Sequence, residues 1–346
     1  MKVAIGIGGP ASGRDGNFGE VADFVAEAEK LGVDQVWSAE AWGQDAVAPL
    51  AFVAARTSKI RLGTGIMQIS ARAPAMTAMT ALTMASITGG RFMLGLGVSG
   101  PQVVEGLHGV PYAKPLTRLR ETIDILKLAF AGEKIRYDGE VLKFPRPGGK
   151  GKALRLSQPA NPDIPIYLAT LGPKSLEFTG AAADGWVGTS FTPEQGEGVV
   201  SSIRAGAEGA GRPMSAVDLQ AGGSVAFGDD IDALVKPRKG MLAFTLGAMG
   251  SAEQNFYNDA FRRQGYEEVG IESQRLWLEG KRAEAAEVIP DSMVLQSNLL
   301  GTEAMVRARI EAYRKAGITT LRVHPAGKGA KEQLETLGRV MDLVGR

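Results

Sequence analysis

The feature that most constrains the fold is a regular alternation of short apolar segments with longer amphipathic ones along the 346 residues. Each short segment predicts a strand, and each longer one, with apolar side chains at helical spacing, predicts a helix. The predicted strands are residues 2–8, 34–38, 60–66, 91–97, 164–169, 185–189, 217–227 and 319–324. The predicted helices are residues 17–31, 45–56, 74–88, 115–130, 174–183, 193–210, 230–246, 301–316 and 331–344.

Strands that alternate with helices predict a parallel sheet. Eight such units, with strands that are apolar on both faces, favour an α/β fold that closes into a single (β/α)8 TIM barrel. An open doubly wound sheet is the alternative. We expect one domain over residues 1–346, with insertions at about 132–163 and 250–290. The first insertion predicts a small hairpin around 137–144, and the second is helical and charged.

Composition excludes several classes of site. The chain has no cysteine, so it forms neither disulfides nor thiolate zinc sites. Its two histidines, His108 and His324, cannot build a three-histidine metal site, and we expect no metal. A net charge of +1 gives no basic excess for nucleic acid. The apolar run at the amino terminus is broken by Gly6 and is too short for a signal peptide or a membrane span, which predicts a cytoplasmic protein.

The segment Gly95–Gly100 matches the pattern G-x-G-x-x-G and follows the fourth predicted strand. In a Rossmann fold this turn follows the first strand, and an acidic residue about 20 positions later ends the next strand. Here Glu121 falls inside a predicted helix, and the stretch after Pro101 predicts no clear helix. Two interpretations remain: a phosphate cradle of backbone N–H groups, or a tight turn at the barrel rim.

Further candidates follow other strands, where the catalytic groups of barrels collect. Gly63 and Gly65 interrupt an apolar strand, which indicates either a bulge against a ligand or a tight barrel corner. Glu40 follows the second strand and is either a functional carboxylate or a solvated one. His324 ends the last strand, where an imidazole could move protons or the His-Pro pair could simply end the strand.

Four segments together resemble one family. Residues 61–112 (RLGTGIMQIS…GRFMLGLGVSG…VPY) are similar to the core motif of the luciferase-like flavin and deazaflavin oxidoreductases. Residues 36–57, 165–188 and 299–323 resemble the flanking barrel units of the same family. The resemblance covers nearly the whole chain, is weakest over about 240–295, and is strongest to the branch that depends on coenzyme F420.

This resemblance implies an oxidoreductase that transfers a hydride between the deazaflavin C5 of coenzyme F420 and a small organic substrate. It implies a non-proline cis peptide at Gly65–Ile66 behind the ring, and it places Glu40 near the reactive side. Glu40 is the first candidate for handling protons and His324 the second. The residues expected to bind the cofactor are Glu40, Gly65, Ile66, Gly97, Val98, Ser99, Gly100, Ala169, Thr170, Gly172, Gly188 and Thr189.

The resemblance also implies a homodimer formed through helices near the second and third strands. The Met-rich segment 75–87 fits that role, although a core helix has the same pattern. The sixth strand runs into GTSFTPEQ without a lysine, which argues against a sugar-phosphate substrate. The family's frequent histidine is Glu40 or Ala41 here, which leaves the acid/base open. The alternatives are an FMN-dependent luciferase-like monooxygenase and a non-catalytic flavin-binding protein.

Overall fold

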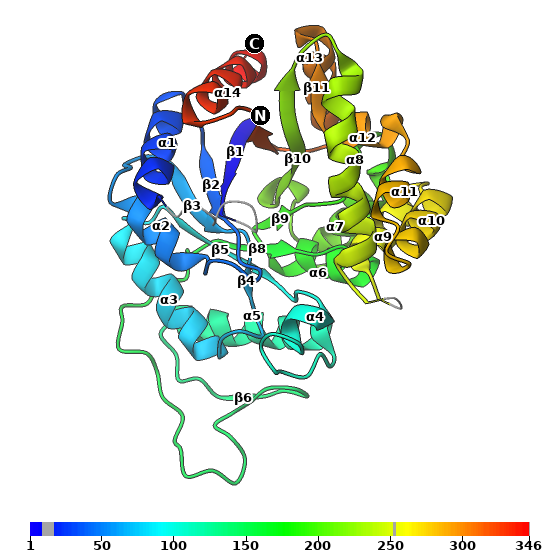
Figure 1. The fold of residues 1–346 in the computed structure, drawn as a ribbon. Helices are drawn as coiled ribbons and strands as arrows, with labels where there is room; N and C mark the ends of the chain where they lie inside the picture. Colours follow the sequence, from blue (N-terminus) through cyan, green and yellow to red (C-terminus); the bar gives the residue numbers. More distant parts are fainter. Residues whose placement is uncertain (9–16, 252–253, 346) are drawn as a thin grey trace.

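The computed structural model describes residues 1–8, 17–251 and 254–345. Eight parallel strands form a closed barrel, in which each strand pairs with the next and the last pairs with the first (Figure 1). In barrel order they are β1 (Lys2–Ile7), β2 (Gln35–Ser38), β3 (Arg61–Thr64), β5 (Phe92–Gly97), β8 (Ile166–Ala169), β9 (Gly185–Val187), β10 (Asp218–Phe227) and β12 (Thr320–Pro325). The predicted (β/α)8 barrel is therefore confirmed, and the open sheet is excluded.

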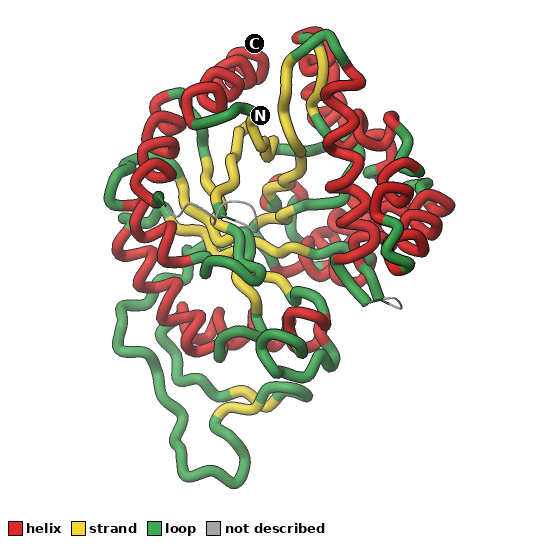
Figure 2. The backbone as a smooth tube through the Cα atoms, in the orientation of Figure 1, coloured by secondary structure: helices red, strands yellow, loops and turns green. Residues whose placement is uncertain are grey.

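Helices surround the strands on the outside, as the tube view shows (Figure 2). The first helix illustrates why they begin and end where they do: the Asn17 side chain accepts from the Glu20 amide, and Gly32 ends the helix with φ +90°. The helices of the barrel are α1 (Phe18–Lys30), α2 (Val47–Ala54), α3 (Pro74–Ile87), α5 (Pro115–Phe130), α6 (Pro173–Ala182), α7 (Glu197–Gly209), α8 (Ile231–Ala248), α13 (Glu303–Lys315) and α14 (Ala330–Gly345).

The barrel interior is packed by large side chains, with Trp37 and Tyr167 in edge-to-face contact at 5.0 Å between ring centroids. Glycines make this packing possible. A Cβ on Gly63 would lie 2.4 Å from the Trp37 ring, and one on Gly95 would lie 1.9 Å from the Thr64 carbonyl oxygen. These two glycines therefore serve the barrel interior, which accounts for Gly63 without a ligand.

Three predicted elements differ from the structure at their ends, and one helix appears that was not predicted. The third strand breaks after Thr64 and resumes as β4 (Met67–Gln68). A four-residue helix, α4 (Pro101–Val104), begins at the proline where no clear helix was predicted. The helix predicted from residue 301 begins at Glu303, because Leu299–Gly301 forms strand β11 beside β10. The 3₁₀ turn Pro193–Gln195 opens the segment predicted as a helix from 193.

The two segments interpreted as insertions carry their own elements. The first holds the predicted hairpin, with β6 (Tyr137–Asp138) antiparallel to β7 (Lys143–Phe144), and extends away from the barrel as a long loop (Figure 1). The second holds α9 (Phe256–Arg263), α10 (Glu267–Leu278) and α11 (Arg282–Glu287), followed by α12 (Asp291–Ser297). The division into one domain with two insertions stays a prediction. No helix in the described ranges has the length and apolar character needed to cross a bilayer.

Candidate functional site

A bulge lies where the third strand ends. Gly63 pairs with Met93 and Met67 with Leu96, so this chain segment holds one residue more than its partner between the two pairs. The extra length contains the cis peptide bond Gly65–Ile66, which the resemblance implies. The backbone amide of Gly65 donates a hydrogen bond to the Ser38 carbonyl at 2.7 Å. The bulge turns the Ile66 side chain toward the carboxyl ends of the strands, where it meets a cavity.

This carboxyl-end cavity encloses about 720 Å³, within the usual range for cofactor sites. Its walls are mostly apolar, and ten of the twelve residues predicted to bind a cofactor lie on them. These ten are Glu40, Gly65, Ile66, Gly97, Val98, Ser99, Gly100, Ala169, Thr170 and Gly172. The structure therefore brings together residues from the ends of four strands that are far apart in sequence.

Glu40 is buried, with a side chain 8% exposed, and both of its carboxylate oxygens are engaged. Arg72 donates to one oxygen at 2.7 Å and to the other at 2.8 Å, a bidentate pair. The amides of Ala46 and Gln68 donate to the same carboxylate at 3.1 and 3.0 Å. The hydrogen bonds to Glu40 raise the pKa of Arg72 above its ordinary value. Glu40 thus connects the end of β2 to β4 and to the segment before α2.

Two loops form the polar rim of the cavity. After β5, Ser99 adopts φ +60°, and its carbonyl accepts from the Tyr112 hydroxyl at 3.1 Å. Burial raises the pKa of Tyr112 to about 12, so this phenol keeps its proton at neutral pH. After β8, the Thr170 carbonyl accepts from the indole of Trp186 at 2.9 Å. Both loops are braced by hydrogen bonds of their own, so their backbone groups meet the cavity in a fixed arrangement.

Three predicted site residues do not lie on the walls of this cavity. Gly188 packs against the Trp186 ring, where a Cβ would lie 2.4 Å from it, and Trp186 belongs to the core outside the barrel interior. Thr189 lines a separate hollow of about 280 Å³, here called the side pocket. His324 lies on the far side of the barrel, next to Gly6 on β1. His324 is exposed to solvent, but desolvation by the protein around it and the neighbouring Arg322 lower its pKa to about 4, so the imidazole is neutral at pH 7.

Sequence reasoning missed the wall that the second insertion supplies. Ala248, Met249, Phe256 and Tyr257 line the carboxyl-end cavity, and Tyr257 follows the α9 cap residue Asn255 by two positions. Trp42 and Lys174 were also missed. The cap at Asn255 is a readable signal for a helix start, but nothing in the sequence indicates that the insertion folds back over the cavity.

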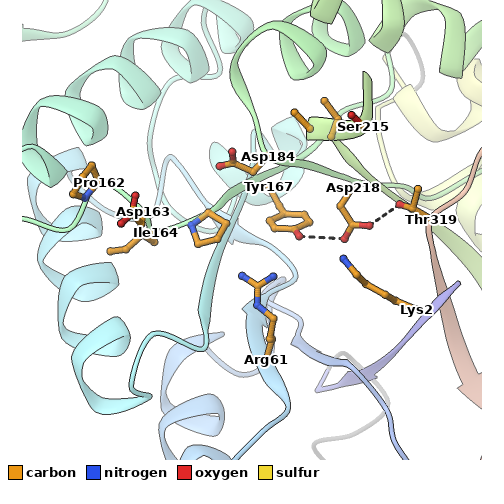
Figure 3. A pocket seen from close by; sticks show the side chains of 13 residues that line it. Lys2, Arg61, Pro162, Asp163, Ile164, Tyr167, Asp184, Ser215, Asp218 and Thr319 are labelled. Atoms are coloured by element: carbon orange, nitrogen blue, oxygen red, sulfur yellow. Dashed lines mark hydrogen bonds between the residues drawn. The ribbon is translucent and has the colours of Figure 1, made fainter. Parts of the chain in front are cut away.

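A second large hollow, the amino-end pocket, lies at the opposite end of the barrel and encloses about 550 Å³ (Figure 3). Its walls are polar, with Lys2 and Arg61 opposite Asp218 and Tyr167 (Figure 3). Asp218 accepts hydrogen bonds from Tyr167, Thr319 and Thr320 at 3.1, 2.6 and 2.7 Å. Burial alone would raise the pKa of Asp218, but these hydrogen bonds outweigh it and lower the pKa. Because the active sites of barrels occupy the carboxyl end, we regard this network as structural.

Comparison with known proteins shows which proteins this chain resembles. The chain is 39% identical to a Mycobacterium tuberculosis protein named as a coenzyme F420-dependent oxidoreductase, over 92% of this chain and 94% of that protein. It is 29% identical to 5,10-methylenetetrahydromethanopterin reductase of Methanolobus tindarius, over 94% of this chain and 96% of that one.

The solved structure of coenzyme F420-dependent tetrahydromethanopterin reductase from Methanopyrus kandleri superposes with a TM-score of 0.79 at 25% identity. The match covers 98% of this chain and 97% of that one. The family model described as luciferase-like monooxygenase matches residues 3–320, from the second residue of β1 to the first residue of β12. The predicted resemblance is therefore confirmed, and the chain belongs to the luciferase-like monooxygenase family.

Proposed function

We propose that this protein is a coenzyme F420-dependent oxidoreductase that acts on a small organic substrate in the carboxyl-end cavity. The observation that carries the proposal is the set of ten predicted cofactor residues on the walls of one 720 Å³ cavity, with the Gly65–Ile66 bulge among them. The relative and the solved structure whose names include coenzyme F420 support the same choice of cofactor.

The residues present fit such a cofactor. The apolar walls around Ile66, Ala169 and Leu119 suit a flat deazaflavin ring, since few polar groups there would lose hydrogen bonds to water. The rim differs: the backbone of residues 97–100 and the side chains of Lys174 and Ser175 can hold a charged side chain. When bound, the cofactor supplies hydride transfer at C5, while the protein orients it and excludes water.

Glu40 serves as a positioning residue in this proposal rather than as the proton-handling group expected from the sequence. Four hydrogen bonds occupy its two oxygens, which leaves little capacity to accept a proton from a ligand. Its role is to hold β4 and the bulge in place beneath the ring. His324, the second candidate from the sequence, does not lie on the walls of this cavity, so the proposal gives it no contact with the substrate.

The test is a titration of the purified protein with F420 and with FMN, followed by oxidation of reduced F420 with a panel of carbonyl compounds and enones. We expect binding of F420, little binding of FMN, and loss of reduced-deazaflavin absorbance with at least one compound. Tight binding of FMN without F420 would instead support the luciferase-like monooxygenase alternative. Binding of F420 without turnover of any compound would support the non-catalytic flavin-binding protein.

We also propose that the protein is a homodimer. Helices α2 and α3 expose large apolar side chains next to each other, with Phe52, Met76 and Met79 exposed by 42%, 53% and 44%. The opposite side of α3 packs into the core through Ala78, Ala81 and Leu82, so this helix has two apolar faces. An exposed face of this kind is typical of an interface with a second copy. Light scattering of the purified protein measures its molar mass in solution and so tests whether it is a dimer. The cytoplasmic location stays a prediction from the sequence.

A further inference from the structure

One face of helix α9 connects two hollows. Tyr257 lines the carboxyl-end cavity, whereas Ala260, Arg263 and Gln264 line the side pocket. These positions are three or four residues apart, so they lie on one side of the helix in the order in which the hollows follow each other. A long molecule that leaves the cavity along α9 therefore enters the side pocket.

The loop after β8 forms the wall opposite α9. Thr170, Leu171 and Pro173 line both hollows, so the hollows are neighbours that share this loop, and the stretch between the loop and α9 is here called the passage. Helix α9 is held rigidly across from this loop. The side-chain amide of Asn255 donates to the Leu246 carbonyl at 2.7 Å. The side-chain amide of Asn258 donates to the carbonyls of Leu246 and Gly270 at 2.9 and 2.8 Å. Both asparagines are buried, so the passage has fixed sides.

Two cations lie beside the shared loop: Arg263 lines the side pocket, and Lys174 lines the carboxyl-end cavity. The Arg263 guanidinium donates to the Leu171 carbonyl at 2.9 Å. Within the part of the chain that the structure describes, no carboxylate oxygen lies within 4.0 Å of Arg263 or of Lys174. The preceding Arg262 differs, since it pairs with Glu267 at 3.0 Å and with Asp259 at 3.7 Å. Arg263 is therefore held at the loop with donors free for an anion from outside the protein.

The side pocket offers further polar groups at its inner end. Ser190 adopts φ +51°, and its hydroxyl is enclosed with no hydrogen-bond partner among the described residues. Thr189, predicted from the resemblance to lie beside the cofactor, is on the same wall. An enclosed hydroxyl without a partner is unfavourable unless a ligand or water supplies one. The passage thus combines cations at its entrance with hydroxyl groups within.

We propose that the negatively charged end of the cofactor's side chain, the glutamyl carboxylates beyond the phosphate, extends from Lys174 at the rim of the carboxyl-end cavity to Arg263 in the side pocket. The inference rests on the proposed function, because it takes F420 as the molecule in the carboxyl-end cavity. The ligand class is an extended chain of several carboxylates. Helix α9, which belongs to the insertion, would then select for the length of that chain.

The experiment measures dissociation constants by deazaflavin fluorescence for three ligands: the riboside without phosphate or glutamates, F420 with two glutamates, and F420 with a longer tail. The variants are Arg263→Gln, Lys174→Gln and the matched control Arg262→Gln. We expect Arg263→Gln and Lys174→Gln each to weaken binding of tailed F420 by about two- to fivefold at low salt, the range for an exposed ion pair. Binding of the riboside should not change, and the control should bind all three ligands like the wild type.

Salt provides a second readout, because exposed ion pairs are screened. The advantage of tailed F420 over the riboside should shrink with added salt in the wild type and should depend less on salt in Arg263→Gln. Equal affinity of Arg263→Gln and wild type for every tail length would overturn the inference, as would an equal loss for the riboside. Failure of the wild type to bind any of the three ligands would reject the proposed function itself, which keeps the two outcomes distinct.

Discussion

Each end of the barrel holds a pocket, but the side chains that line the two pockets differ in chemistry. The amino-end pocket is lined by charged and hydroxyl side chains that bond to one another around Asp218 (Figure 3). The carboxyl-end cavity is lined mainly by apolar side chains and by the backbone of two loops. Trp37 and Tyr167 fill the barrel between them.

The difference indicates that one end of the barrel serves the stability of the fold and the other end serves ligand binding. At the amino end, hydrogen bonds within the protein satisfy the buried polar groups, so a ligand would have to break them. At the carboxyl end, the buried carboxylate of Glu40 also has its hydrogen-bond partners within the protein. The rest of the cavity wall is mostly apolar. We therefore expect substitutions at the amino end to change the free energy of unfolding and those at the carboxyl end to change ligand affinity.

The largest effect is expected for Asp218→Ala. The substitution removes the acceptor of the Tyr167 and Thr320 hydroxyls, which belong to buried residues, and of the exposed Thr319 hydroxyl. We expect the free energy of unfolding to fall by about 3 kcal/mol, the scale for buried groups that lose their partners. Urea denaturation measures this free energy of unfolding. The control is Asp163→Ala, an exposed carboxylate of the same pocket, which should stay within about 0.5 kcal/mol of wild type. A drop in F420 affinity of the folded Asp218→Ala protein, at unchanged stability, would reverse the comparison.

Glu40→Gln should have a smaller effect on stability and a clear one on binding. The amide keeps the shape but loses the charge that pairs with Arg72, at about 1–3 kcal/mol for a hydrogen bond to a charged group. Because the bulge rests on this pair, we expect F420 to bind about tenfold more weakly by fluorescence titration. Wild-type affinity in Glu40→Gln would show that the pair does not position the ring site.

Tyr112→Phe removes the hydrogen bond to the Ser99 carbonyl and leaves the ring in place. We expect a loss of about 1 kcal/mol in F420 binding, the usual contribution of one hydrogen bond. The riboside without phosphate should be affected less, since the loop at Ser99 is assigned to the phosphate-bearing part. A larger loss for the riboside than for F420 would place the ring, rather than its side chain, at this loop.

The smallest effect is expected from pH, because the His324 side chain is exposed and solvent screens much of its interaction with the protein. The folded state lowers the pKa of His324 to about 4 from an ordinary value of 6.5, so the native protein disfavours the protonated imidazole. The contribution of His324 to stability is complete above pH 6.5 and is lost as the pH falls toward 4. We expect the urea midpoint of His324→Gln to decline less than that of wild type between pH 7 and pH 4. Identical declines would mean that His324 titrates normally.

Features set by local sequence patterns could be predicted from the sequence, whereas features set by tertiary contacts could not. The eight strands could be read from local apolar patterns, and the resemblance identified the bulge at Gly65–Ile66 and both rim loops. The bidentate partner of Glu40 could not be read, because Arg72 is 32 positions away and meets it only through the bulge. Tyr257 and Arg263 were missed for the same reason: their helix reaches the cavity by tertiary packing of an insertion where the resemblance is weakest.

The most direct test of the comparison is a crystal structure of the protein with F420. We predict electron density for the deazaflavin ring in the carboxyl-end cavity against Gly65 and Ile66, with the phosphate next to the loop at residues 97–100. The amino-end pocket should hold only water. Density for the ring in the amino-end pocket, or a ring that leaves Ile66 uncovered, would contradict the account.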